Sequence, residues 1–456
     1  PAPEFAKPHP CAFEVALNEL KKIGIPADQV IMVGDHNDDY YSAYYQNINF
    51  IAVLQGQSDR DNFLKIGIDN SLIIDDLNNL ETAIKQSILI TNYRRSLQNN
   101  SALDGRYGAT TYQLKHYFSE YAFHKYRVKA EVEHLIALSE FFNGVVVRPL
   151  SGQEKVDLRQ IADSFSWTEA YEVLQYDHLG RNGIGPVEHD TKAIELWLRE
   201  KLDKSTVYDL IPSIHIFLTS EDARNIAHKL MLRAALNDIF MPAIYKVGDR
   251  LKKLSQQYLG YPVMGRTHFQ PASPTTFGKI FAIYLARLTQ SLERLFAVKL
   301  QVKINGAVGN YNSFMSAYPE LDWINYSKYL AKQVNFSSFL WTDQRGPHND
   351  VVRLFQSLQE IGNILRDLSA DLSYYAGLGL MYFSKVESHV GSSVMPHKIN
   401  PWFAEIAEGS LRRANALING LSNDLDVSRL QRDLSDHEWE RSYGEMFGYI
   451  YVAIDH

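Results

Sequence analysis

VVRLFQSLQEIGNILRDLSADL, residues 351–372, is the stretch of this sequence that decides the fold. Its apolar residues recur at spacings of three and four, which places them on one face of a helix: Val351, Leu354, Leu358, Ile361, Leu365, Leu368 and Leu372. Such a seam is typical of long helices that pack side by side as in a coiled coil. The stretch therefore predicts a long helix in a helical bundle.

A second seam follows the same spacing: Leu285, Leu288, Leu292 and Leu295. No proline lies between Pro274 and Pro319, so this part of the chain can also form a long helix. From about residue 93 onward the pattern is almost entirely helical. Two such seams favour long parallel or antiparallel helices packed around a common core.

The N-terminal part, to about residue 90, alternates short apolar runs with longer polar or amphipathic segments. The runs are rich in β-branched residues and cover residues 30–33, 50–54 and 71–74. This alternation is typical of a parallel sheet with crossover helices. We therefore expect an α/β segment over residues 1–92, followed by helical domains over residues 93–210 and 211–456.

Composition and charge exclude several classes of protein. The 456 residues carry 46 basic and 53 acidic side chains, a net charge of −7, so no bulk positive charge supports binding to nucleic acid. With 45% hydrophobic and 22% charged residues, the chain has the balance of an ordinary folded protein. It has no apolar run of membrane-spanning length. The single cysteine, Cys11, cannot form an internal disulfide, which favours the cytoplasm.

An acidic turn, GDHNDD at residues 34–39, directly follows the first apolar run. Its carboxylates are expected at the carboxyl end of a strand, where open α/β sheets bind ligands, and they suit a hard divalent cation. Together with Lys7-Pro8 upstream, the turn resembles the last two motifs of the haloacid-dehalogenase-like hydrolases. That resemblance implies Lys7 as a phosphate contact and Asp35 and Asp39 as possible Mg²⁺ ligands. No DxDx-type strand with a nucleophile precedes Lys7, so we expect no phosphatase activity, and a helix-capping turn is the alternative.

The most specific motif is GSSVMPHKINP, residues 391–401. It packs two hydroxyls, a lysine and an asparagine between glycine and proline, which predicts a loop. A serine can act as a base where its alkoxide is stabilised, and the lysine and asparagine can hold a carboxylate. The string resembles the signature of the fumarase/aspartase superfamily.

Other stretches resemble one branch of that superfamily, the adenylosuccinate lyases of bacterial purine synthesis: SALDGRY at 101–107, TSED at 219–222, GRTHFQPASPTTFGK at 265–279, KINGAVGNYN at 303–312 and SRLQRDLSD at 428–436. The resemblance runs in unbroken order from about residue 101 to the C-terminus. It implies a mostly α-helical fold with a long-helix bundle. It also implies a homotetramer in which each active site draws loops from three subunits.

The resemblance implies β-elimination of fumarate from adenylosuccinate, leaving AMP, and from the related succinyl-carboxamide ribotide. Such a reaction needs a base for a weakly acidic C–H and an acid for the departing nitrogen. By position, Ser392 is the implied base, with Ser393 as its competitor, and His268 is the implied acid. His189 would orient the acid, with a structural hydrogen bond as the alternative, and Lys398 would stabilise developing charge. The resemblance implies no cofactor and no metal in the lyase part.

Further residues are implied as substrate contacts. The succinyl carboxylates would be held through neutral and charged hydrogen bonds by Thr219, Ser220, Gln270, Lys398 and Asn400. The phosphate would be held by Arg106, Tyr107, Arg429 and Arg441, because a planar guanidinium suits phosphate. A solvated helix face is the alternative for Arg429, Arg432 and Arg441.

Several residues depart from the family pattern near the site. Phe269 stands where the family has glycine, and its ring would crowd a backbone that passes close to substrate. Four others replace polar family residues: Glu188, Gly346, Ile406 and His437. A donor lost from a buried polar site leaves its partner unpaired, at about 1–3 kcal/mol.

Two other functions remain open at this stage. One is a catalytically weakened lyase-fold protein that serves as a binding or assembly subunit, and the other is a lyase for a different fumarate-yielding substrate. The family continues into a further helical domain after the QRDL stretch, whereas this sequence stops at His456. We therefore expect that the chain is a fragment of a longer fusion or the product of an incomplete gene.

Overall fold

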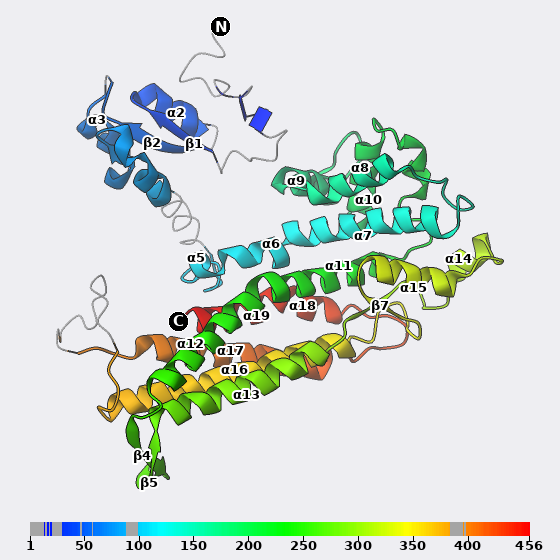
Figure 1. Cartoon of the computed structure of the whole chain (residues 1–456). Helices are drawn as coiled ribbons and strands as arrows, with labels where there is room; N and C mark the ends of the chain where they lie inside the picture. The colour runs from blue at the N-terminus through cyan, green and yellow to red at the C-terminus, as the bar shows by residue number, and fades with distance from the viewer. Residues whose placement is uncertain are drawn as a thin grey trace. The chain divides into compact units, whose positions relative to one another are not determined.

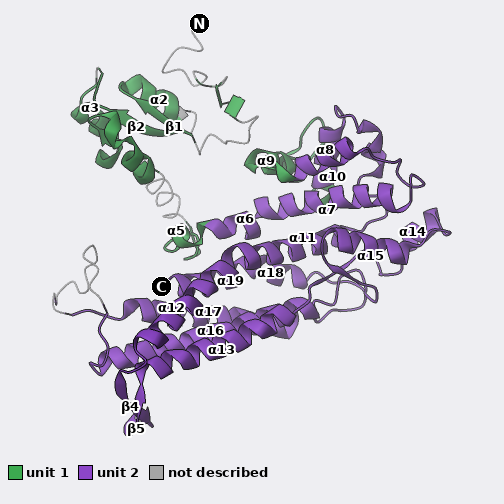
Figure 2. Ribbon diagram, viewed as in Figure 1, with its two compact units in different colours: residues 1–112, 163–193 green, residues 113–162, 194–456 purple. Residues whose placement is uncertain are grey.

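The structure is a computed structural model that describes residues 13, 16–17, 19–20, 30–45, 48–56, 58–87, 99–383, 395 and 398–456. It divides into two compact units, coloured green and purple in Figure 2. Unit 1 comprises Pro1–Tyr112 and Asp163–Ala193, and unit 2 comprises Gln113–Ala162 and Ile194–His456. The domain bounds expected from the sequence, at residues 92 and 210, stay a prediction.

Unit 1 contains a parallel sheet of β1 (Ile31–Gly34), β2 (Asn49–Val53) and β3 (Ile73–Ile74), in that order. Its core includes Ile51, Ala52 and Phe63, which are fully buried. The strands alternate with α2 (Asn37–Tyr45), α3 (Arg60–Lys65) and the short 3₁₀ turns η3 (Asn70–Leu72) and η4 (Leu77–Asn79). This confirms the α/β pattern expected from the three apolar runs.

Unit 1 also contains short helical segments, among them α5 (Gly108–Thr111), α9 (Trp167–Leu174) and the π-helical η6 (Gln175–Leu179). The 3₁₀ turn η5 (Tyr112–Leu114) begins in unit 1 and ends in unit 2. Ser166 and Glu169 form a capping box at the start of α9, which satisfies two backbone N–H groups of its first turn.

Unit 2 is built from helices, although α8 and α10 begin or end in residues assigned to unit 1. The elements are α6 (Lys115–Phe118), α7 (Glu120–Phe141), α8 (Gly152–Asp163), α10 (Asp190–Leu202), η7 (Tyr208–Ser213), α11 (Ser220–Ala235), η8 (Leu236–Phe240), α12 (Met241–Gln257), α13 (Phe277–Ala297), α14 (Asn312–Ala317), α15 (Trp323–Gln333), α16 (Asn349–Gly377), α17 (Trp402–Asp424), α18 (Asp436–Arg441) and α19 (Tyr443–Asp455).

The two seams form the core of a bundle, as expected. Helix α16 covers the first seam and α13 the second. Helix α16 packs against α13 and against α17, and Figure 1 shows α13 and α16 running side by side along the bundle. Leu358 and Ile361 are fully buried, and burial of one such side chain stabilises the fold by about 1.5–3 kcal/mol. A Cβ on Gly362 would lie 3.1 Å from the Leu411 side chain, so this glycine lets α16 and α17 approach closely. The bundle is therefore held by the residues that the helical spacing identified.

Two strand pairs interrupt the helical pattern of unit 2, and the sequence did not predict them. Strands β4 (Pro262–Thr267) and β5 (Gln270–Thr276) form an antiparallel hairpin that contains the histidine motif. Strands β6 (Gln301–Lys303) and β7 (Ser337–Phe339) form a short parallel pair. Among the helices of the described residues, none is long and apolar enough to cross a membrane.

Candidate active site

The start of α11 carries the first predicted pair of carboxylate contacts. Thr219 directly precedes the helix and Ser220 is its first residue, and both side chains are half-buried. The N–H of Thr219 donates to Asp222 Oδ2 at 2.9 Å, which satisfies one donor at this end. The first turn of a 16-residue helix carries partial positive charge, which favours a carboxylate, and a capping box of Thr219 and Asp222 closes this end. Both residues thus lie where an anionic substrate group is stabilised.

A buried ion pair joins this helix start to a second motif. Lys303 Nζ lies 2.7 Å from Asp222 Oδ1, and both side chains have no solvent exposure. The same carboxylate accepts the N–H groups of Asn305 and Gly306, each at 3.1 Å. Asn225 completes the junction, because its side chain bonds both the C=O and the N–H of Lys303 at 2.9 Å. The ion pair and these hydrogen bonds therefore hold the start of the 303–312 stretch against the start of α11.

His268 occupies the tip of the β4–β5 hairpin. His268 and Phe269 form a two-residue connection, with φ of +52° and +62°. A hairpin turn with positive φ at both positions favours asparagine and glycine, because a Cβ is strained there. Phe269 is 73% exposed, and its ring lies 5.7 Å from that of Tyr374. Phe269, one of the departures from the family pattern, thus lies in a strained and exposed turn. Gln270, which follows it, begins β5 and has an exposed side chain.

Within one chain, His268 lies far from the start of α11. Figure 1 shows the β4–β5 hairpin at one end of the bundle and α14 with β7 at the other. The start of α11 lies at the latter end, since Asn225 and Lys303 join it to β6, which pairs with β7. The implied acid His268, with Gln270 beside it, is thus not brought together with Thr219 and Ser220 in a single copy.

The signature loop is only partly described. Ser392, the implied base, and Ser393 lie outside the described residues. Lys398 is exposed, and its backbone N–H donates to the C=O of Met395 at 3.0 Å. Asn400 is half-buried, two residues before α17 begins. In α17, Ile406 is half-buried as well.

Three predicted residues belong to unit 1. Arg106 is exposed, and the backbone N–H of Tyr107 donates to the C=O of Ala102 at 2.8 Å, just before α5. His189 is exposed, and its Nδ1 accepts the N–H of Lys192 at 3.3 Å. Because Nδ1 accepts, a neutral ring carries its proton on Nε2. This bond lies at the start of α10, and the role of His189 in orienting the acid stays a prediction. The preceding Glu188, one of the departures, has a φ of +47°.

The three C-terminal arginines differ in their surroundings. Arg429 and Arg441 are exposed, and the Arg441 guanidinium lies 3.3 Å from Glu438. Arg432 instead donates to Asp436 Oδ2 at 2.7 Å and reaches Glu221 Oε2 at 3.4 Å. Of the three, Arg432 is the arginine that contacts the TSED stretch, and it was missed as a site residue. Its sequence neighbourhood carries no signal that separates it from the other two.

His437, another departure, lies between two guanidinium groups. Its Nδ1 is 3.2 Å from Arg224 NH1, and its Nε2 is 2.5 Å from Arg432 NH2. Burial and the charge of Arg224 lower the pKa of His437 to about 4, so the ring is neutral at physiological pH. A neutral ring accepts on one nitrogen only, so it accepts from one of the two guanidinium groups; Arg224 also binds Glu440, and Arg432 also binds Asp436. The remaining departure, Gly346, is half-buried two residues before His348.

The acidic turn of unit 1 lies at the carboxyl end of β1, as expected. Asp39 is buried, and its Oδ2 accepts the N–H groups of Asp35 and His36, each at 3.2 Å. Asp35 is exposed, and a Cβ on Gly56 would lie 1.9 Å from its carboxylate, so only glycine allows this approach. Lys7, the implied phosphate contact, lies outside the described residues. Asp39 Oδ2 thus accepts two N–H groups of the turn, and its role as a Mg²⁺ ligand stays a prediction.

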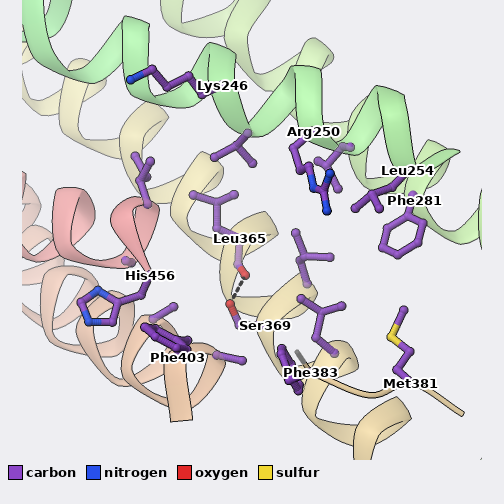
Figure 3. A pocket seen from close by; sticks show the side chains of 18 of the residues that line it. Lys246, Arg250, Leu254, Phe281, Leu365, Ser369, Met381, Phe383, Phe403 and His456 are labelled. Carbon is purple, nitrogen blue, oxygen red and sulfur yellow. Dashed lines mark hydrogen bonds between the residues drawn. The ribbon is translucent and has the colours of Figure 1, made fainter. Parts of the chain in front are cut away.

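A separate cavity of about 900 Å³ lies among α12, α13, α16, α17 and α19 (Figure 3). Its lining is largely apolar, with Leu254 and Phe281 among its residues and Lys246 and Arg250 on α12. The Ser369 hydroxyl that faces it donates to the C=O of Leu365 at 2.9 Å. No predicted site residue of the described part lines this cavity, so it is distinct from the candidate active site.

Comparison of the sequence with known proteins identifies the families to which its two parts are similar. A lyase family model matches residues 105–415, and a HAD-hydrolase-like model matches residues 4–80. The chain is 36% identical to adenylosuccinate lyase from Vibrio cholerae over 355 residues, or 77% of this chain and 76% of that protein. It is 35% identical to adenylosuccinate lyase from Escherichia coli K12 over 359 residues, or 78% of this chain and 77% of that protein.

Solved structures show the same fold. A 3-carboxy-cis,cis-muconate lactonizing enzyme from Pseudomonas putida superposes with a TM-score of 0.61 at 20% identity, over 75% of this chain and 73% of that chain. A fumarate lyase from Mesorhizobium gives 0.59 at 19% identity, over the same shares of both chains. The family match and the identities above are high enough to assign the chain. It belongs to the lyase family that includes the adenylosuccinate lyases, with a HAD-like segment at its N-terminus.

Proposed function

We propose that this lyase eliminates fumarate from adenylosuccinate and from the succinyl-carboxamide ribotide of purine synthesis. The proposal depends above all on the buried Asp222–Lys303 pair, which holds Thr219 and Ser220 at the positive end of α11. Two predicted carboxylate contacts are thereby held at a position that favours an anion. The similarity to adenylosuccinate lyases over more than three quarters of the chain supports the same substrate class.

The proposed chemistry divides among the chain's own groups. Ser392 Oγ takes the proton from the carbon next to a succinyl carboxylate, and the electron pair forms the C=C bond of fumarate. The adjacent C–N bond breaks, and His268 supplies a proton to the departing nitrogen. Lys398, with the donors at Thr219 and Ser220, stabilises the doubly charged carboxylate that develops during proton removal.

The position of His268 supports a site shared between copies of the chain. The histidine lies on an exposed hairpin at the end of the bundle away from α11. A second copy must therefore bring its hairpin to the start of α11, as the proposed homotetramer would. The His268→Ala and Ser392→Ala variants should each be inactive, and mixing them in equal amounts under subunit exchange should restore activity. If each site takes His268 and Ser392 from different copies, about a quarter of the sites should contain both intact residues. No recovery in demonstrably mixed oligomers would contradict the shared site.

The direct test adds adenylosuccinate to the purified full chain and measures fumarate. Wild-type protein should release fumarate and AMP, while Ser392→Ala should lose turnover and still bind nucleotide. Ser393→Ala is the matched control and should keep most of the activity. Parallel assays with argininosuccinate and aspartate distinguish the proposed substrate from other fumarate-yielding ones. Turnover of either in place of adenylosuccinate would overturn the substrate assignment.

A second candidate function is a weakened lyase that serves as an assembly subunit. The strained Phe269 at the tip of the hairpin favours it, because the neighbouring His268 must be placed accurately for proton transfer. A stable oligomer that binds adenylosuccinate without releasing fumarate would establish this second candidate.

A further inference from the structure

Four ligand-type side chains converge in the interior of unit 2. Glu221 lies in the first turn of α11, His348 directly precedes α16, and Asp436 and Glu440 belong to α18. Each offers one oxygen or nitrogen, and these four atoms lie within 4.8 Å of one another. All four residues are at most 4% exposed. Elements far apart in the sequence thus bring three carboxylates and an imidazole to one buried point.

Arginines occupy only one oxygen of each carboxylate. Arg224 binds Glu440 Oε2 at 2.8 Å, and Arg432 binds Asp436 Oδ2 at 2.7 Å and reaches Glu221 Oε2 at 3.4 Å. Among the described residues, one atom of each of these four side chains has no hydrogen-bond partner: Glu221 Oε1, His348 Nε2, Asp436 Oδ1 and Glu440 Oε1. His348 Nε2 does lie 3.5 Å from Asp436 Oδ2, as a long ion pair. A buried polar atom without a partner costs about 1–3 kcal/mol. Because the same four side chains each bring a ligand-type atom within 4.8 Å of the others, their unpartnered atoms point to a missing shared partner.

We propose that Glu221, His348, Asp436 and Glu440 bind a divalent transition-metal ion such as Mn²⁺ or Zn²⁺. Carboxylates favour Mn²⁺ and imidazole favours Zn²⁺, and a mixed set accepts either. Bonds of about 2.1 Å place tetrahedral ligands about 3.4 Å apart and opposite octahedral ligands about 4.2 Å apart. The cluster, whose four atoms lie within 4.8 Å of one another, therefore needs to contract by about half to one and a half ångströms. Arg224 and Arg432 would then donate hydrogen bonds to the carboxylate oxygens that do not bind the ion, as hydrogen-bond partners of ligating carboxylates commonly do. The ion would tie α11 to α18 and to the start of α16.

The test measures binding of Mn²⁺ to the full chain after removal of metal with a chelator. The paramagnetic resonance signal of free Mn²⁺ should fall with one ion bound per chain, and Zn²⁺ should displace it. Pulsed measurements should show coupling to an imidazole nitrogen, which His348→Gln removes. Glu440→Gln should weaken binding about tenfold or more, since even the loss of an outer-shell partner has an effect of that size.

Asp350→Asn is the matched control. Asp350 is a buried carboxylate at the start of α16, but it pairs with Lys229 at 2.7 Å outside the cluster. This variant should bind Mn²⁺ as the wild type does. Absence of stoichiometric binding to the wild type, or equal affinity in the folded Glu440→Gln and Asp350→Asn variants, would overturn the proposal. If Glu440→Gln does not fold, the Mn²⁺ affinity of His348→Gln is compared with that of Asp350→Asn instead, and equal affinities would overturn the proposal.

A bound water at the four atoms is the competing explanation. An experimental structure of Mn²⁺-soaked protein with a water and no anomalous signal at this point would establish it. The binding measurement uses no substrate and does not rest on the proposed lyase function. A failed fumarate assay would leave the metal site standing, and a failed Mn²⁺ titration would leave the elimination standing.

Discussion

Replacement of Lys303 by methionine tests whether the buried pair with Asp222 holds the substrate end of α11 in place. Both side chains are fully buried and lie 2.7 Å apart. Removing one partner of such a pair leaves an uncompensated charge, which costs about 3–5 kcal/mol. Asp222 retains three backbone N–H donors, at 2.9, 3.1 and 3.1 Å, so we expect a value near the lower end.

This loss of stability should appear as a lower Tm. For a unit of this size about 2 °C of Tm corresponds to 1 kcal/mol, so a loss of about 3 kcal/mol should lower the Tm of Lys303→Met by roughly 6 °C relative to the wild type. The Asp222→Asn/Lys303→Met double variant should lose less than the sum of the single variants, because neither charge then stays unpaired. Below the unfolding range, the KM for adenylosuccinate should rise in Lys303→Met because Thr219 and Ser220 lose their fixed position.

Arg287→Met supplies the control on the surface of the same unit. Arg287 pairs with Asp367 at 2.5 Å, but the two side chains are 42% and 51% exposed. Water screens such a pair, and its loss should cost at most about 1 kcal/mol. Equal Tm values for Lys303→Met and Arg287→Met would refute the role given to the buried pair. An unchanged KM in a destabilised Lys303→Met would refute only its link to substrate binding.

Three further predictions concern the hairpin, the buried cluster and the bundle. Phe269→Gly should relieve about 1–2 kcal/mol of the strain caused by the left-handed backbone at residue 269, partly offset by the greater chain entropy of glycine in the unfolded state. The variant should also release fumarate faster than the wild type. A turnover below that of the wild type would contradict this. In the folded protein the pKa of Glu221 is raised from its ordinary 4.5 to about 8. Between these two pH values the native state holds a proton that the unfolded chain has lost. Metal-free protein should therefore lose stability as the pH rises from about 4.5 to about 8. Glu221→Gln should not show that loss, and parallel curves of Tm against pH for the two proteins would contradict the raised pKa. Leu358→Ala in the core should cost about 2–5 kcal/mol in thermal unfolding, whereas Leu368→Ala, at a partly buried position, should cost clearly less.

The long helices and the small sheet were predictable because their burial follows a simple period. Leu358 and Ile361 recur at helical spacing since one face of α16 meets its neighbours. The run at residues 50–54 is continuously apolar because a strand of a parallel sheet is covered on both faces. In both cases the apolar pattern directly reports which side chains leave water.

The β4–β5 hairpin was not predictable in this way. Its strands are mostly exposed, so no face of them produces an alternating apolar pattern. The turn itself has positive φ at two residues, where glycine or asparagine would have been the usual signal. With His268 and Phe269 in those positions, that signal is absent.

The motif residues of the candidate site could be named from the order of residue types along the chain, because chemistry at a loop or a helix start needs particular groups. Their neighbours could not be named. Arg432 meets Glu221, and Lys303 meets Asp222, across long stretches of chain, and residues of similar type nearby face water instead. Local pattern specifies which face of an element is apolar, whereas the pairing of buried charges depends on how the packed helices are rotated against one another. That rotation follows from the packing of the whole core, and only the folded chain reveals it.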